Sequence, residues 1–152
     1  MLRSWLEILL TVAVVLLVAG CNTTSHPPVD EVTGVVTWQG KPVEGAEIAF
    51  APVPQTPDVH PARATTDVSG RYRLQTYFSE TEDVQGCRPG EYYVTITKIK
   101  PPSGPVDPYT NPGALTIEHL IPAQYADIKT SGLKATVEAK AMQFDYVLKD
   151  AP

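Results

Sequence analysis

The sequence predicts an all-β sandwich of seven short strands, preceded by one helix in an N-terminal signal segment. Three observations predict this class. Short runs of alternating or β-branched residues recur along the chain, and Gly, Pro and Asp turn signals separate them. All 15 prolines lie after residue 26, which argues against long helices there. One apolar face per strand fits two sheets packed face to face.

The first three predicted strands cover residues 31–38, 45–51 and 62–67. The first is rich in β-branched residues and runs into a turn at residues 39–42. In the second, alternation places Ile48 and Phe50 on one face. All three are too short and too interrupted to predict helices.

Sharp turns precede the next two predicted strands. Asp67 to Gly70 has the residue preference of a type I turn and leads into residues 71–77, while residues 88–91 lead into 92–99. Two last strands, residues 133–139 and 144–148, are predicted to form a hairpin through Ala141 and Met142. The loops at 52–61 and 101–112 are rich in proline.

The N-terminal segment contains 13 mostly apolar residues, Ile8 to Gly20. Crossing a bilayer takes about 20 apolar residues, so this run fits a signal-peptide core, with a helix over residues 4–18. It ends in Val18, Ala19, Gly20 and Cys21, which resembles the bacterial lipobox. That resemblance implies cleavage before Cys21 and attachment of diacylglycerol and palmitate-type acyl chains to it. An ordinary secretory signal and a single-span anchor are the alternatives.

This interpretation divides the chain into three parts. Residues 1–20 are the signal peptide, residues 21–30 the lipidated cysteine with a flexible tether, and residues 31–150 the sandwich. The expected location is the bacterial cell envelope, with the protein held on a membrane through Cys21. The sequence leaves open whether that membrane is the inner or the outer one.

Three motifs in the sandwich resemble the carboxypeptidase regulatory-like domain, a family with a transthyretin-like, Greek-key sandwich related to the immunoglobulin-like folds. Residues 32–50 match its opening pattern, residues 66–72 its Thr-Asp-x-x-Gly-x-aromatic signature, and residues 89–94 its Pro-Gly-x-Tyr-x-Val signature. The resemblance covers residues 31–99 and implies a module without catalytic activity.

The motif residues have structural explanations. Gly40, Gly70 and Gly90 suit positive φ angles, and Asp67 can accept backbone hydrogen bonds inside its turn. Tyr92 follows a corner, where its hydroxyl can bond the backbone as in a tyrosine corner.

Charge and residue spacing exclude several classes of function. A net charge of −5 and a pI near 5.1 argue against a nucleic-acid partner. His26, His60 and His119 lack metal-ligand spacing, and no catalytic residue, metal or cofactor is expected. Cys87 is expected to be an inert thiol, although Arg88 beside it leaves a reactive cysteine open.

We therefore expect a lipid-anchored, non-enzymatic structural or interaction module. It would present residues 52–61 and 101–114 to an envelope protein or a glycan. The alternative is a carbohydrate- or calcium-binding surface module. Sugar would stack on exposed rings, and calcium would bind Asp67 with the acidic run at 80–83. The candidate ligand contacts are Trp38, Tyr77, Phe78, Tyr93, Tyr109 and Asp67.

Overall fold

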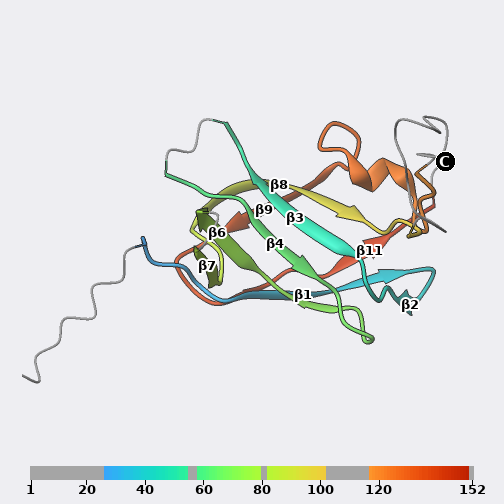
Figure 1. Ribbon diagram of the computed structural model, residues 1–152, viewed down its shortest axis with the longest axis horizontal. Coiled ribbons are helices and arrows are strands. Elements are labelled where there is room, and N and C mark those ends of the chain that lie inside the picture. The colour runs from blue at the N-terminus through green and yellow to red at the C-terminus, as the bar shows by residue number, and fades with distance from the viewer. Residues whose placement is uncertain (1–25, 55–57, 80–81, 102–116, 151–152) are drawn as a thin grey trace, which may run out of the picture.

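The computed structural model describes residues 26–150 except 55–57, 80–81 and 102–116. The predicted all-β sandwich is confirmed, since eleven strands form two sheets in these ranges (Figure 1). A single turn of 3-10 helix, Ala123–Ala126, interrupts them. None of the described residues belongs to a helix with the length and hydropathy of a membrane span. The predicted signal helix at 4–18 lies outside the described residues.

The first sheet is built around β1 (Val32–Trp38). On one side β10 (Met142–Gln143) and β11 (Tyr146–Leu148) run parallel to β1. The strands β2 (Lys41–Pro42) and β5 (Arg71–Arg73) pair with it antiparallel. Every other strand of this sheet therefore depends on β1 for its backbone hydrogen bonds.

The second sheet has six strands in the order β7-β6-β4-β3-β8-β9, all antiparallel. Its central strands β3 and β8 have the longest pairing, from Glu47 opposite Thr97 to Pro52 opposite Tyr92. The bounds are β3 (Glu47–Pro52), β4 (Ala62–Thr65), β6 (Gln75–Ser79), β7 (Glu82–Gln85), β8 (Gly90–Thr97) and β9 (Leu133–Val137).

The hydrophobic core lies between the two sheets. Val32 and Val36 of β1 are fully buried, as are Phe50 of β3 and Tyr92 of β8. The Phe50 ring lies 5.7 Å from that of Tyr92 and 6.0 Å from that of Phe144, which precedes β11, so aromatic contacts join the layers. The alternation read from the sequence thus identifies the faces that pack together.

Two side chains fix the corners of the sandwich through hydrogen bonds to the backbone. The Tyr92 hydroxyl donates to the Arg88 carbonyl oxygen at 2.8 Å, which confirms the predicted tyrosine corner. The buried Thr66 hydroxyl accepts from the Ala46 amide at 2.8 Å and donates to the Val43 carbonyl oxygen at 2.6 Å. These three bonds satisfy backbone groups where strands end.

The strand count of seven is wrong for the described residues. The run at 71–77 divides at Leu74 into β5 and β6, which belong to different sheets. The Leu74 amide donates to Val32 of the first sheet, and its carbonyl oxygen accepts from Gly86, next to β7. The other three strands that the sequence does not predict are β2, β7 and β10. Each has only two to four residues, which suffice for pairing but are too few to show an alternating pattern.

The predicted hairpin through Ala141 and Met142 is also wrong. β9 pairs with β8 in the second sheet, whereas β10 and β11 pair with β1 in the first. The Met142 amide donates to the Glu31 carbonyl oxygen. The chain therefore crosses between the layers here, and alternation within a strand does not specify its partner.

Candidate functional site

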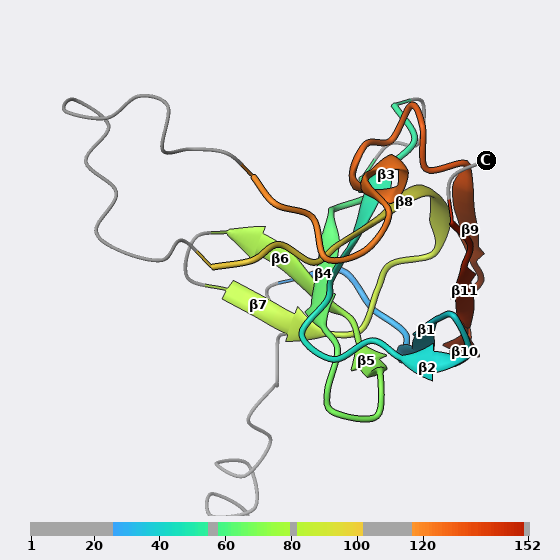
Figure 2. The ribbon, with the colours of Figure 1, turned by 90° about the vertical axis from the view of Figure 1, so that its right-hand side faces the viewer.

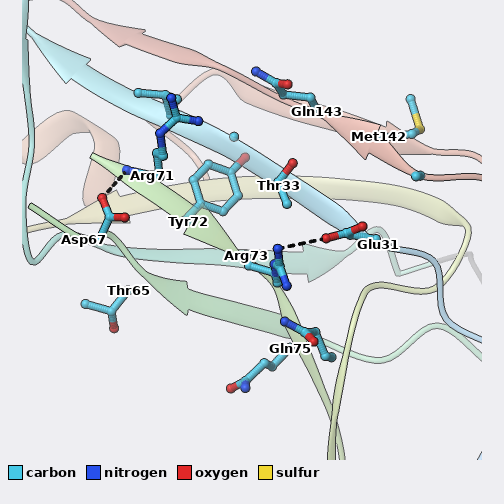
Figure 3. A pocket seen from close by; sticks show the side chains of 14 residues that line it. Glu31, Thr33, Thr65, Asp67, Arg71, Tyr72, Arg73, Gln75, Met142 and Gln143 are labelled. Carbon is cyan, nitrogen blue, oxygen red and sulfur yellow. Dashed lines mark hydrogen bonds and ion pairs between the residues drawn. The ribbon is translucent and has the colours of Figure 1, made fainter. Parts of the chain in front are cut away.

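A polar groove of about 800 Å³ opens where the two sheets diverge beside β5. We call it the seam groove. Its lining comes from both layers: Arg71, Tyr72 and Arg73 belong to β5, while Thr65, Gln75 and Gln85 belong to the second sheet. Figure 2 shows β5 at the seam between the layers, and Figure 3 shows the side chains that line the groove.

The groove exists because the chain changes sheets at Leu74. β5 pairs with β1 alone, with Thr33 opposite Arg73 and Val35 opposite Arg71. β4 pairs with β6 only through Ala62 and Arg63, so its end at Thr65 diverges from that strand. The seam groove is the space between this end of β4 and the edge of β5.

The turn before β5 is held rigidly by Asp67. One oxygen of its carboxylate accepts from the Ser69 amide at 2.8 Å, the Ser69 hydroxyl at 2.7 Å and the Arg71 amide at 2.9 Å. The predicted role of Asp67 inside its turn is thus confirmed. The hydrogen bond from the Ser69 hydroxyl and that from the Arg71 amide hold the carboxyl pKa below its ordinary value.

Gly70 completes this turn. It has a φ of +72°, and a Cβ there would lie 2.6 Å from the Val36 carbonyl oxygen. Only glycine fits this backbone angle and this approach to β1.

The floor of the groove is anchored by Tyr72. Its ring is buried, and its hydroxyl donates to the Phe144 carbonyl oxygen at 2.7 Å. Burial raises the pKa of Tyr72, so the phenol stays neutral at physiological pH. The ring is a structural support for β5 and not an acid–base group.

The two arginines of the groove differ in their partners. Arg73 forms an ion pair with Glu31 at 3.2 Å, and both side chains are half-exposed (Figure 3). Arg71 is exposed, and within the described part of the chain its guanidinium has no hydrogen-bond or ion-pair partner. Within the described chain its charge is engaged only through a weak attraction to the Asp67 carboxylate, so Arg71 is the least committed charge of the groove.

None of the described aromatic residues predicted from the sequence as ligand contacts lines this groove, and Trp38 lies far from the adjacent pair Tyr77 and Phe78. The Trp38 indole, at the end of β1, donates to the Asp150 carboxylate at 2.8 Å. Tyr77 on β6 is 40% exposed, with the Arg63 guanidinium 5.7 Å above its ring. Tyr93 on β8 packs beneath Lys134, whose Nζ atom lies 5.6 Å from the ring centre. Tyr109 lies outside the described residues.

Phe78 is the centre of a cluster that the sequence did not reveal. His26 stacks on it at 5.0 Å between ring centres, and His60 lies 4.8 Å away. Two histidines that are far apart in sequence thus meet on one ring, where the tether enters the domain. His119 is elsewhere, in a bridge to Ile99.

The candidate sugar contacts do not converge. Leu74 directly precedes β6, and its amide donates to the carbonyl oxygen of Val32 at the start of β1. Trp38 is the last residue of β1, roughly 20 Å from Val32 along the strand. Tyr77 and Phe78 lie beyond the start of β1, so no single saccharide contacts them together with Trp38.

The candidate calcium ligands are separated as well. Asp83 pairs with Tyr77 on β6, and the neighbouring residue Thr76 pairs with Ala62 on β4. Asp67 follows Ala62 by five residues, and the chain runs away from Asp83 over that stretch. The two aspartates are therefore about 15 Å apart. Residues 80–81 lie outside the described chain, and no three metal-binding side chains cluster in the rest.

Cys87 is fully buried beside Tyr92. Burial raises the pKa of its thiol to about 11, which outweighs the opposite effect of its hydrogen-bond contacts with the Tyr92 side chain and the Arg88 backbone. The thiol is inert, as expected, and the reactive alternative is not supported.

The two proline-rich loops are rooted at opposite ends of the sandwich. The first loop begins at residue 53, directly after Pro52, which pairs with Tyr92 near the start of β8. The second loop follows residues 98–100, which continue from Thr97, the last residue of β8. The described roots of the two loops therefore lie at different ends of the sandwich, and residues 55–57 and 102–116 lie outside the described chain. The register of β3 and β8 separates these roots by the length of the strands.

We call the end that carries Asp30, Phe78 and Cys87 the tether end, and the end that carries Trp38 and Thr97 the far end. Asp30 pairs with Cys87 just before β8, so the chain enters the domain beside the loop at 53–61. In Figure 1, β6 and β7 lie at the left with the start of the described chain, and β2 lies at the right.

Comparison with known proteins leaves the family open. No protein-family model matches the chain, and neither does any curated protein. A DUF3823 family protein from Parabacteroides merdae is 12% identical, with a TM-score of 0.37, over 79% of this chain and 45% of that one. A 9R-lipoxygenase from Cyanothece is 12% identical, with a TM-score of 0.36, over 85% of this chain and 18% of that one. The chain spans less than half of either structure, and similarity this low assigns no activity.

Proposed function

We propose that this chain is a lipid-anchored protein of the bacterial cell envelope, whose sandwich is a non-enzymatic interaction module of the carboxypeptidase regulatory-like kind. The observation that carries the proposal is the order of the N-terminal residues. An apolar run too short to span a bilayer ends directly in Val18, Ala19, Gly20 and Cys21. The small residues suit cleavage, and the cysteine supplies the thiol for the lipid.

The second cysteine supports this assignment by exclusion. Cys87 is fully buried and its thiol pKa is raised, so it is not an acylation site in the folded protein. Cys21 is then the thiol to which the lipid attaches.

The position of the tether gives the module a defined orientation. Asp30 is the ninth residue after Cys21, and a chain of this length spans at most about 30 Å. The tether end is thus held near the bilayer, and the far end, with Trp38, faces away from it. The seam groove extends along the side of the domain between these ends.

The family assignment is supported by the roles of its motif residues. Asp67 and Gly70 form the tight turn before β5, and Tyr92 forms the corner before the long strand β8. These are the positions at which the three motifs place their turn and corner residues. None of these side chains is free for catalysis.

Acylation is tested by labelling cells with an alkyne analogue of palmitate and separating the membranes from the soluble fraction. We compare the full-length wild type with Cys21→Ser and, as the matched control, Cys87→Ser. The wild type and Cys87→Ser should carry label and sediment with membranes. Cys21→Ser should lose the label. Labelled Cys21→Ser, or unlabelled wild type, would overturn the proposal.

A further inference from the structure

We propose that the seam groove binds a saccharide that carries a carboxylate, and that Arg71 holds this carboxylate. The inference rests on the proposed function only in treating the sandwich as an interaction module. It places the ligand on the side of the domain, away from the aromatic residues that the sequence suggested.

The first argument is charge. Four charged side chains line the groove, and three of them are already engaged. Arg73 and Glu31 neutralise each other, and Asp67 is bound within its own turn. Arg71 has a weak attraction to the Asp67 carboxylate but no side-chain hydrogen bond or ion pair within the described chain, and a guanidinium binds a carboxylate through two parallel hydrogen bonds.

The second argument is hydrogen-bonding capacity. Gln75 and Gln85 face the groove from the second sheet, both exposed and without a side-chain hydrogen bond in the described chain. Each amide donates and accepts, as a vicinal diol also does.

Across the first sheet, Arg73, Thr33 and Gln143 lie opposite one another on three neighbouring strands, a row of about 10 Å. Arg73 is paired with Glu31 and the Gln143 amide nitrogen donates to the Asp145 carboxylate, so the Thr33 hydroxyl and the Gln143 amide oxygen are the groups of this row without a protein partner among the described residues. This row is comparable in length to a disaccharide.

The third argument separates a saccharide from a protein partner. Protein interfaces depend on apolar or aromatic anchors in a desolvated centre. The exposed large apolar side chains of the described residues, such as Val68, Ile117 and Val147, do not line the groove. β5 has only three residues, which is too short an edge for an added peptide strand.

The groove is also rigid before any ligand arrives. The Asp67 turn fixes the backbone of Arg71, and the Tyr72 hydroxyl ties β5 to Phe144 of the first sheet. A site formed in advance loses little conformational entropy on binding.

The test is titration calorimetry of the full-length chain in detergent micelles with digalacturonic acid, a disaccharide that carries carboxylates. Arg71→Gln should raise the Kd at least tenfold, because a hydrogen bond to a charged group is lost. The matched control is Lys134→Gln, which removes one positive charge from β9, at the opposite edge of the second sheet. It should leave the Kd unchanged, and both variants should keep the melting temperature of the wild type.

Two further ligands test the wild type without any substitution. The methyl ester of digalacturonic acid should bind at least tenfold more weakly, since its carboxylates are blocked. A short Asp-containing peptide should not bind. No binding of digalacturonic acid, equal binding of its ester, or preference for the peptide would each overturn the proposal. These outcomes are independent of acylation at Cys21, so they leave the anchoring proposal unaffected.

Discussion

Gly34 lies at the tightest backbone contact of the first sheet. A Cβ at this position would lie 1.8 Å from the Phe144 carbonyl oxygen and 2.7 Å from the Tyr72 ring. Gly34→Ala should therefore push β1 away from the segment before β11, at a cost of about 3 kcal/mol or more in the free energy of unfolding. Urea denaturation measures this loss.

Gly45→Ala is the matched control. Gly45 has a φ of +64°, but its Cβ would have no atom within 4 Å. That variant should lose only about 1 kcal/mol, from the backbone angle alone. Equal losses in the two variants would mean that the contact at Gly34 does not determine stability.

The Asp67 turn makes stability depend on pH in a defined direction. Hydrogen bonds hold the pKa of Asp67 in the folded state below its ordinary value of 3.8. The carboxylate therefore stabilises the fold above that value, and this contribution is lost as the pH falls through the lower folded pKa. Asp67→Asn keeps an acceptor but removes the charge, so its melting temperature should fall below that of the wild type at neutral pH.

The same measurement at acid pH supplies the check. The difference between the wild type and Asp67→Asn should shrink towards zero as the pH is lowered below 3.8. Glu44→Gln, a charge removal at an exposed turn residue with no side-chain hydrogen bond in the described chain, should leave the melting temperature at neutral pH unchanged. A gap between the wild type and Asp67→Asn that persists unchanged in acid would contradict this role of the charge.

At the scale of elements, the sequence predicts strands better than partners. Ile48, Phe50, Val94 and Ile96 are buried as their alternation requires, because one face of each strand must leave water. The crossing at Leu74 and the parallel pairing of β11 with β1 depend on contacts between distant segments. A pattern within one strand contains no information about those contacts.

Hydrogen exchange should follow the pairing of the strands. β8 has a partner strand on each side, whereas β7 lies at the edge of the second sheet and pairs only with β6. The Val94 and Ile96 amides should exchange only through global unfolding, and those of Asp83 and Val84 through faster local opening. Amide exchange followed by NMR separates these regimes. Equal protection in β7 and β8 would contradict the observed strand order.

At the scale of the whole molecule, the proposed tether and the described roots of the two proline-rich loops mark the ends of the domain. The protein anchored on vesicles should place β7 nearer to the lipid headgroups than β2. Fluorophores on Asp83→Cys and Lys41→Cys, quenched by a headgroup-bound quencher, compare these positions. Cys87 is buried and should not react with the dye. Stronger quenching at residue 41 than at residue 83 would reverse the orientation.

The seam groove shows why the sequence predicts the fold better than the site. The sequence predicts Asp67 as a turn residue, because the local motif around it gives a reason for that role. It does not predict Arg71 or Gln85 as site residues, because they meet only after the chain has changed sheets at Leu74. An exposed arginine on a short strand resembles any solvated surface residue until its neighbours are known.

The central claim is that the mature protein begins at a lipid-modified Cys21. The intact mass of the protein extracted from membranes tests it most directly. We predict a chain that begins at residue 21 and whose mass exceeds that of its polypeptide by a diacylglycerol group, with or without a further acyl chain. A chain that keeps residues 1–20, or one that is cleaved but carries no lipid, would contradict the account.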